Sequence, residues 1–243
     1  MPTCICLLIK GKNSEVDYFK NESMFLFNKV STIELSSIAT IRRGLEIGKD
    51  KMTGEKDIVC LNGSAINKYI IKYFNYISKN TLDIFKKNID IFSSPKLVVR
   101  ETGNTFYATF ENENAITNRS LYNVRFTNNL YNPKFVLSLI NSKLFEFYFK
   151  QVIAPDTNIF PKIRIVQLNK IPIPQLPAPK TQNRLVSLVD SMLETQKQYH
   201  AATMEADKKL FKQKIDILDH QIDSLVYQLY GLTEEEIKTV EGK

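Results

Sequence analysis

The C-terminal part of the chain carries the clearest periodic pattern of hydrophobic and polar positions. Between residues 181 and 230, apolar side chains recur every three or four positions, which predicts amphipathic helices. The pattern fades near residues 200–203 and therefore predicts two long helices, with Thr203 as a candidate N-cap and Gly231 as a candidate C-terminal cap. The two apolar stripes comprise Leu185, Leu188, Val189, Met192 and Leu193, and then Leu210, Phe211, Ile215, Leu218, Ile222, Leu225, Val226 and Leu229.

The end of this helical part and its geometry follow from two further features. The sequence TEEE at 233–236 predicts a capping box that opens a last short helix. Glycine and proline are absent between residues 181 and 230, so the pattern leaves open whether the two long helices fold back as a hairpin or continue with a kink. Helices of this length with one apolar face need a partner, which is the other helix, the rest of the chain or another helix pair.

The first 180 residues mostly follow the shorter period of β-strands, with turn residues between them. Gly103 and Asn104 lie between two β-rich runs and predict a hairpin there. Residues 132–153 instead predict one amphipathic helix, or two joined near Asn141 and Ser142. Strands are predicted at 3–11, 38–43, 57–61, 67–78, on both sides of Gly103, before 126 and at 161–174, with a helical turn at 34–37.

A proline-rich segment separates the two patterns. Pro172, Pro174, Pro177 and Pro179 hold the backbone extended and donate no hydrogen bonds to a sheet. We expect this segment to end the sheet and to space the long helices away from it. The predicted fold class is α+β, with a mixed β-rich domain followed by a pair of long helices, divided as residues 1–30, 31–180 and 181–243.

The charge distribution changes at the same place. The whole chain carries a net charge of +7, yet residues 1–180 hold 25 Lys and Arg against 15 Asp and Glu, whereas residues 181–243 hold 8 against 11. A basic body favours a polyanion such as nucleic acid, and the alternative is an ordinary solvated basic surface. Three cysteines are too few for a disulfide framework, and no run of 18 apolar residues exists, so we expect a cytoplasmic protein without a membrane span.

Catalytic motifs do not form a complete set anywhere in the chain. The segment GLEIGKD at 44–50 is one residue short of a phosphate-binding loop and has Asp50 where Ser or Thr binds the metal. Cys4 and Cys6 lack the partners of a zinc site, so no metal site is predicted. His200 and His220 lie on the helical part without a nucleophile beside them. The sequence therefore predicts no catalytic residues and no cofactor in this chain.

Three basic segments of the body combine cations with amides and hydroxyls, namely IRRGLEIGKDK, AITNRSLYN and FPKIRIVQLNK. Lysine and arginine neutralise phosphates, while arginine and asparagine also read base edges with paired hydrogen bonds. Each segment alone is compatible with a solvated surface loop. Together they favour nucleic-acid binding.

Two parts of the sequence resemble a known family. The segment IPIPQLPAPKTQNRLVSLVDSML, in which an Ile-Pro-x-Pro strand leads through a Gln-containing turn into a long helix, resembles the end of a target recognition domain of restriction–modification systems. The tail LDHQIDSLVYQLYGLTEEEIKTVE at 218–241 resembles that of the TaqI-like C-terminal specificity domain of type IIG restriction–methyltransferase enzymes, which is related to type I specificity subunits. IATIRRGLEIGKDK and SSPKLVVRETGNTFYATFENENAITNRSLYNV are similar to its opening and middle, so the likeness spans roughly residues 31–241.

This resemblance implies a function. Such a domain reads a specific DNA sequence and directs an N6-adenine methyltransferase, an endonuclease or both to that site, while S-adenosylmethionine and Mg²⁺ belong to the catalytic domains. Residues 1–30 look like the tail of a methyltransferase-like domain, so we expect a C-terminal fragment or a split subunit. The residues expected to contact DNA are Arg42, Arg43, Lys49, Lys51, Arg100, Asn118, Arg119, Lys162 and Arg164.

Other functions remain open at this point. In the family the long helices support the recognition domain against the catalytic part or space two recognition domains, so the chain is alternatively an assembly module. Its expected partners are double-stranded DNA, a methyltransferase or nuclease domain or subunit, and a second copy of the chain through the C-terminal helices. A third hypothesis, a self-sufficient nuclease or methyltransferase, is disfavoured by the missing motifs.

Overall fold

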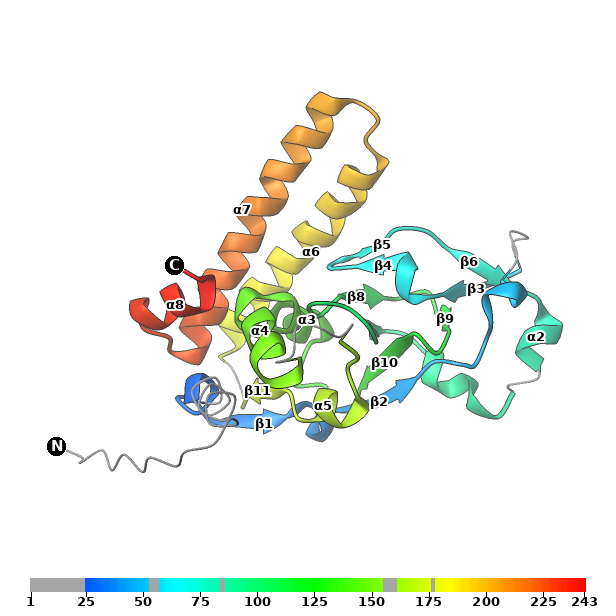
Figure 1. Cartoon of the computed structure of the whole chain (residues 1–243), viewed down its shortest axis with the longest axis horizontal. Coiled ribbons are helices and arrows are strands. Elements are labelled where there is room, and N and C mark those ends of the chain that lie inside the picture. The colour runs from blue at the N-terminus through cyan, green and yellow to red at the C-terminus, as the bar shows by residue number, and fades with distance from the viewer. Residues whose placement is uncertain (1–24, 53–56, 84–85, 155–160, 176–177) are drawn as a thin grey trace, which may run out of the picture.

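A four-stranded antiparallel sheet lies at the centre of the body (Figure 1). The computed structural model describes residues 25–52, 57–83, 86–154, 161–175 and 178–243. The strand order is β2 (Ala39–Arg43), β10 (Leu121–Phe126), β7 (Lys96–Arg100) and β8 (Ala108–Glu111). Strands β2 and β10 confirm the predictions for 38–43 and for a strand before 126. The fold class is α+β, as predicted.

Two smaller sheets lie beside the central one. Strand β3 (Ile58–Leu61) pairs antiparallel with β6 (Asn75–Ile77) and parallel with β9 (Ile116–Thr117), and β4 (Ile66–Asn67) pairs with β5 (Ile70–Ile71). The prediction of one strand at 67–78 was wrong, because Tyr69 adopts a positive φ of 61° and turns the chain between β4 and β5. The strand at 57–61 is confirmed.

Strands β7 and β8 form the predicted antiparallel hairpin around Gly103 and Asn104. The connection runs from residue 101 to residue 107 and is thus longer than a two-residue turn. Short helical segments connect the remaining strands. They are η1 (Leu35–Ser37), η2 (Lys49–Lys51), η3 (Gly63–Ala65), α2 (Lys79–Asp83) and η4 (Lys86–Phe92), and η1 confirms the helical turn at 34–37.

The helical segment 132–153 consists of separate helices. This confirms the second of the two predicted alternatives, in which the helix is interrupted near Asn141 and Ser142. Helix α3 (Pro133–Asn141) begins after Asn132, whose side chain accepts a hydrogen bond from the backbone N–H of Lys134 at 2.9 Å. Helix α4 (Lys143–Tyr148) begins after Ser142 and continues into the π-helical turn η5 (Phe149–Ile153). The break therefore lies at Asn141 and Ser142.

The predicted strand at 161–174 is replaced by two short elements. Helix α5 (Ile165–Asn169) occupies its middle, and only β11 (Pro172–Pro174) is a strand. Strand β11 pairs antiparallel with β1 (Thr32–Glu34), with Ile33 opposite Ile173. The prolines fit there because this is a two-stranded sheet, where the missing proline N–H groups interrupt no larger ladder. The predicted strand at 3–11 lies outside the described residues, as do the other residues from 1 to 24.

The two long helices fold back on each other as a hairpin that projects from the body (Figure 1). Helix α6 spans Pro179–Ala201, α7 spans Glu205–Tyr230 and α8 spans Glu234–Glu241. The N-cap of α7 is Met204, not Thr203, and its side chain makes no capping hydrogen bond. Gly231 has the left-handed conformation of a C-terminal cap, and Thr233 and Glu236 form the predicted capping box. None of the helices in the described part of the chain is long and apolar enough to span a membrane.

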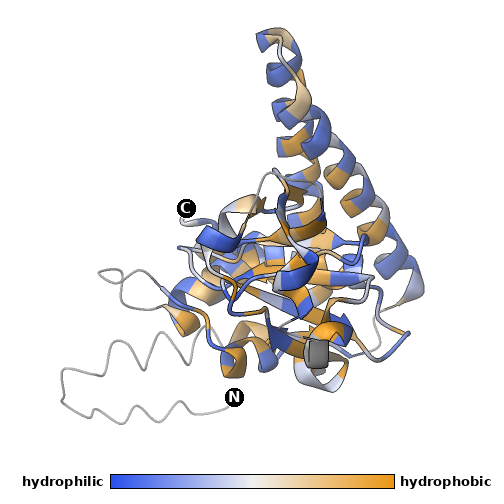
Figure 2. Ribbon diagram, turned by 90° about the vertical axis from the view of Figure 1, so that its right-hand side faces the viewer, coloured by the Kyte–Doolittle hydropathy of each residue, from blue (hydrophilic) through white to orange (hydrophobic). Residues whose placement is uncertain are grey.

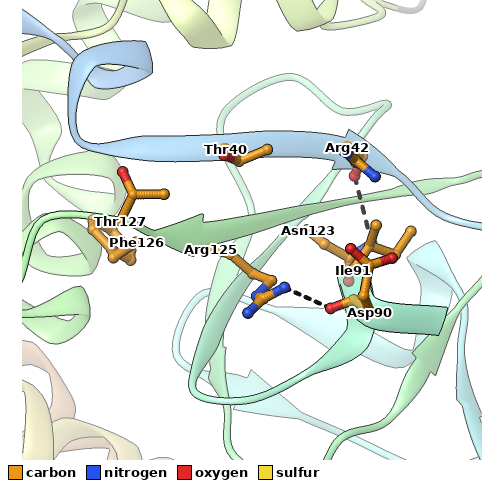
Figure 3. Close-up of a pocket in the computed structure, with 8 residues that line it drawn as sticks. All are labelled: Thr40, Arg42, Asp90, Ile91, Asn123, Arg125, Phe126 and Thr127. Carbon is orange, nitrogen blue, oxygen red and sulfur yellow. Dashed lines mark hydrogen bonds between the residues drawn. The ribbon is translucent and has the colours of Figure 1, made fainter. Parts of the chain in front are cut away.

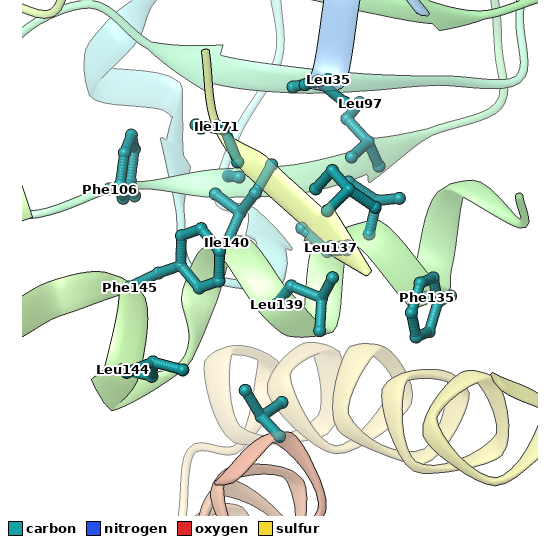
Figure 4. Packing of buried hydrophobic residues seen from close by; sticks show 14 of the residues in the cluster. Leu35, Leu97, Phe106, Phe135, Leu137, Leu139, Ile140, Leu144, Phe145 and Ile171 are labelled. Atoms are coloured by element: carbon teal, nitrogen blue, oxygen red, sulfur yellow. The ribbon is translucent and has the colours of Figure 1, made fainter. Parts of the chain in front are cut away.

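One hydrophobic core joins the hairpin to the body. Helix α3 lies between the central sheet and the hairpin, so its buried residues contact both (Figure 4). The expectation that the prolines space the helices away from the sheet is therefore wrong for the base of the hairpin. Hydrophobic and hydrophilic residues alternate along both long helices (Figure 2). Buried residues from the three layers include Leu97, Val124, Phe135, Leu139, Leu185, Val189, Met192, Ile222 and Val226.

A buried ion pair lies inside the body. Lys96 on β7 pairs with Glu111 on β8, and the side chains are at most 1% exposed. The ammonium also donates to the carbonyl of Phe92 at 2.7 Å, and the carboxylate accepts from the hydroxyl of Ser94 at 2.8 Å. Burial lowers the pKa of Lys96, and the pairing with Glu111 opposes this shift. The two charges thus satisfy each other and hold the β7–β8 hairpin to the neighbouring loops.

Candidate nucleic-acid interface

Two loops of the body lie in direct backbone contact, one after β2 and one before β10. The N–H of Gly44 donates to the carbonyl of Leu121 at 2.9 Å, and the N–H of Leu45 donates to the carbonyl of Thr117 at 2.8 Å. A Cβ at Gly44 would lie 2.3 Å from the carbonyl oxygen of Asn118, a separation that real contacts do not show. Glycine at this position therefore lets the two loops approach each other, so the exposed side chains of Glu46 and Arg119 share one surface.

A buried glutamate anchors two of the predicted cations. Glu101 follows β7 and is 6% exposed. Its carboxylate forms ion pairs with Arg43 at 2.8 Å and with Lys162 at 3.3 Å. Tyr122 lies against the same carboxylate, and burial, together with the charge of Glu101, raises the pKa of Tyr122 to about 12. Glu101 thus fixes cations from two segments that are far apart in the sequence.

Arg43 connects this anchor to the second loop. Its Nε donates to the carbonyl oxygen of Arg119 at 2.7 Å. Glu46, on the same loop as Arg43, accepts from the guanidinium of Arg119 at 2.8 Å and lies 3.8 Å from that of Arg43. The ion-pair network, which we define as Arg119, Glu46, Arg43, Glu101 and Lys162, brings together residues from all three basic segments of the sequence.

Beside this network lies a polar pocket of about 310 Å³. Arg100 at the end of β7 lines it, with its guanidinium 5.4 Å from the ring centre of Tyr107. Asn118 also lines the pocket, but its carboxamide oxygen already accepts from the N–H and the hydroxyl of Ser120. Asn118 thus supports the loop, and its contact with DNA stays a prediction. The polar pocket is lined by Ile47, Gly48, Asn62, Gly63, Ser64, Arg100, Thr102, Asn118, Arg119 and Ser120.

A second pocket, of about 180 Å³, lies over the central sheet near the end of η4 (Figure 3). Arg42 lines it from β2, on the opposite face of that strand from Arg43 because successive strand residues alternate. Arg125 on β10 also lines it and donates to the carbonyl of Asp90 at 2.6 Å. The sequence interpretation missed Arg125, although its position two residues after Asn123 places both on one face of the predicted strand.

The remaining predicted contacts lie in other surroundings. Lys51 is exposed in η2, and the side chain of Lys49 is outside the described part of the structure. Arg164 is exposed at the start of α5, where its N–H donates to the side chain of Gln167 at 2.8 Å. Glu46 and Glu101 were missed because the interpretation considered cationic, amide and hydroxyl side chains but no carboxylates, and the charge pattern of 42–46 was the available signal. Within the described residues, no group of three His, Cys, Asp or Glu side chains is arranged to hold a metal ion.

Comparison with known proteins finds a family model that matches part of the chain. Residues 58–173 match the family model of the TaqI-like C-terminal specificity domain. The resemblance to target recognition domains of restriction–modification enzymes is thereby confirmed for this part of the chain. A search of curated protein sequences gave no match.

Solved structures share the fold at low sequence identity. The type IIG restriction endonuclease BpuSI is 11% identical with a TM-score of 0.56, over 89% of this chain and 34% of BpuSI. The type IIL restriction–modification enzyme MmeI, solved in complex with DNA, is 14% identical with a TM-score of 0.56, over 84% of this chain and 34% of MmeI. The type I S subunit from M. genitalium is 15% identical with a TM-score of 0.48, over 71% of this chain and 41% of that chain. The chain thus spans between about a third and about two fifths of the length of these structures.

Proposed function

We propose that the chain reads a specific DNA sequence as the specificity part of a restriction–modification enzyme. The observation that carries this proposal is the match of residues 58–173 to a specificity domain. That segment contains five residues that were predicted from the sequence as DNA contacts, namely Arg100, Asn118, Arg119, Lys162 and Arg164. The function therefore rests on a family assignment and on a basic surface within the same residues.

The electrostatics of the body support this proposal. Residues 1–180 hold ten more cationic than acidic side chains, 25 against 15, and a surface of this sign attracts a polyanion. Glu101 and the carbonyl of Arg119 hold the guanidinium of Arg43, so this group loses less entropy when it binds DNA. Fixed donors suit sequence reading, since a base edge is recognised by hydrogen bonds at defined positions.

The catalytic partner belongs to the same proposal. A chain of this kind directs an N6-adenine methyltransferase, an endonuclease or both, and the neighbours BpuSI and MmeI are enzymes of restriction–modification systems. S-adenosylmethionine and Mg²⁺ would be bound by that partner. In this view residues 31–180 read the target, and the helical hairpin supports them against the catalytic part.

The experiment is a selection of randomised duplex DNA on the purified full chain, at about 50 mM and about 200 mM salt. We expect an enriched motif of a few base pairs and an affinity that falls several-fold or more at the higher salt, because phosphate contacts release counterions. Arg43→Gln and Arg119→Gln should weaken binding, whereas Arg184→Gln on α6 serves as a matched control. Absence of binding to any duplex at low salt, even with a partner methyltransferase supplied, would contradict the proposal.

A second candidate function is assembly through the helical hairpin. Met204, Leu210 and Ile217 are 60–68% exposed, although they are large apolar residues. Leu210 and Ile217 are seven residues apart on α7, so they lie on the same side of that helix. Sedimentation of the chain alone and with a methyltransferase subunit tests this function. If it holds, Leu210→Ser with Ile217→Ser abolishes the association and leaves DNA affinity unchanged.

A further inference from the structure

Glu46 is an unusual residue for a surface that binds a polyanion. It lies among predicted DNA contacts, and its side chain is 62% exposed. A carboxylate at this position repels phosphate and lowers the charge that the neighbouring arginines offer to the DNA backbone. If the surface served only to attract phosphate, Glu46 would weaken it.

The fold does not need Glu46 to hold the two loops together. The backbone bonds of Gly44 and Leu45, and the bond from Arg43 to the carbonyl of Arg119, already join them. An exposed ion pair contributes little to stability, because water screens it and ordering its two side chains costs entropy, so the structural effect of Glu46 is small. The effect of Glu46 is therefore on what Arg119 presents to a ligand.

The pair presents a donor and an acceptor side by side. The guanidinium of Arg119 and the carboxylate of Glu46 are 2.8 Å apart, and each side chain is 62% exposed. Because their charges cancel, the pair attracts a phosphate weakly. A base-pair edge that offers an acceptor beside a donor matches it better.

The hydrogen-bond pattern of the major groove identifies that edge. Arginine binds the O6 and N7 acceptors of guanine, and glutamate accepts from the N4 amino group of cytosine. A G·C pair presents these groups next to each other. A carbonyl in place of the cytosine amino group would face the carboxylate of Glu46 and be repelled, which adds discrimination against the wrong pair.

We infer that Glu46 and Arg119 together read one G·C base pair, with Arg119 on guanine and Glu46 on cytosine. This inference rests on the proposed function, because it names the base pair that the same surface recognises. It makes Glu46 a specificity-determining residue, which the count of cations in the sequence had passed over.

The first test is the randomised-duplex selection applied to the full chain and to Glu46→Gln, Arg119→Lys and the control Glu194→Gln on α6. We expect the wild type to select a motif with a G·C pair whose preference falls about 5- to 150-fold in the first two variants, the range for one paired contact. Arg119→Lys keeps the charge but loses the paired geometry, so its salt dependence should stay unchanged. Glu194→Gln makes the same charge change as Glu46→Gln, away from the surface, and should select the wild-type motif.

A second test separates reading from positioning. In the selected duplex, the cytosine of that pair is replaced by 2-pyrimidinone, which lacks the 4-amino group. The wild type should lose affinity for this duplex about 5- to 150-fold, and Glu46→Gln should lose much less. An equal loss in both proteins would show that Glu46 makes no contact with the amino group, which would overturn the inference.

The outcomes also distinguish this inference from the proposed function. If Glu46→Gln selects the wild-type motif with equal or higher affinity, Glu46 only adjusts the charge, and DNA reading by the chain stands. The G·C assignment is also overturned if the variants lose their preference at an A·T pair, or if the wild type binds DNA without selecting any motif. If the wild type binds no duplex even with its partner supplied, the proposed function itself fails.

Discussion

The body and the helical hairpin bury different kinds of side chain. Among the buried polar and charged residues of the described chain, twelve lie before residue 178, and two, Thr195 and Asp223, lie in the hairpin. The body buries an ion pair, Lys96 with Glu111, and the anchoring carboxylate of Glu101. The hairpin buries a stripe of aliphatic residues against itself and α3.

This difference shows which residues determine the structure of each region. An apolar stripe needs only the correct period and volume, and it tolerates exchange of similar side chains. A loop that carries functional groups needs particular partners, because an unpaired buried charge costs several kcal/mol. The body should therefore respond sharply to the loss of single polar contacts, while the hairpin should respond to the loss of its few polar contacts with the body.

The largest expected effect on stability comes from breaking the buried ion pair of the body. Lys96→Met leaves the carboxylate of Glu111 buried without its cation, so we expect a loss of about 3–5 kcal/mol in the free energy of unfolding. Lys134→Met is the matched control, because the 2.5 Å pair of Lys134 with Asp190 lies at the surface between α3 and α6. That control should cost less than about 1 kcal/mol. Urea denaturation measures both, and similar losses would contradict the comparison.

An intermediate effect concerns the acid that joins the hairpin to the body. Asp223 on α7 is 2% exposed and accepts from the N–H of Lys143 at the start of α4. Burial raises the pKa of Asp223 to about 7, although the hydrogen bond from Lys143 acts in the opposite direction. Burial also raises the pKa of the nearby Asp219. The folded state therefore binds more protons than the unfolded state between about pH 4 and pH 7.

It follows that the contribution of Asp223 to stability falls as the pH rises through this window. Asp223→Asn keeps an acceptor for Lys143 and removes the charge, so at pH 8 it should be more stable than the wild type, by about 2–4 kcal/mol. At pH 4.5, close to the usual pKa of an aspartate, the difference should shrink to about 1 kcal/mol. Thermal unfolding between pH 4.5 and pH 8 measures the difference, and parallel curves would rule out the assigned titration.

The smallest effect concerns the end of the hairpin. The hydroxyl of Tyr230 donates to the carbonyl of Pro172 at 2.7 Å, which ties α7 to strand β11. Tyr230→Phe removes this bond and keeps the ring contacts with Phe27 and Phe145, so it should cost about 1 kcal/mol. Tyr73→Phe, which removes an exposed hydroxyl bonded to Ser64, should cost less. If Tyr230→Phe has the same urea midpoint as the wild type, the hydrogen bond to the carbonyl of Pro172 makes no net contribution to stability.

The same difference explains what could be predicted from the sequence. The long helices were predicted with nearly correct bounds, because helix periodicity and the caps at Gly231 and Thr233 are local signals. Thr203 as the N-cap moved the start of α7 by a single residue, and Leu210, predicted on the apolar face, is exposed. The pairing of α6 with α7 could not be predicted, since it depends on contacts between distant residues.

The body was predicted less well because its structure depends on distant partners. A pattern of alternation at 67–78 does not reveal the positive φ of Tyr69, and the apolar run at 161–174 does not distinguish α5 from a strand. The candidate site shows the same limit. The cations Arg43, Arg119 and Lys162 were found by residue type, but the carboxylates of Glu46 and Glu101 that connect them become visible only in three dimensions.

The pairing of β1 with β11 has a consequence for how such a chain can change. Thr32 lies opposite Pro174, and Glu34 lies opposite Pro172. The segment 35–171 therefore begins and ends at neighbouring points of one small sheet. A segment whose two ends lie close together can be exchanged as a unit without moving what lies outside it. If the proposed function holds, replacing 35–171 by the corresponding stretch of a related chain would change the DNA target, and the hairpin would keep its place where that stretch preserves the face of α3 that packs on α6.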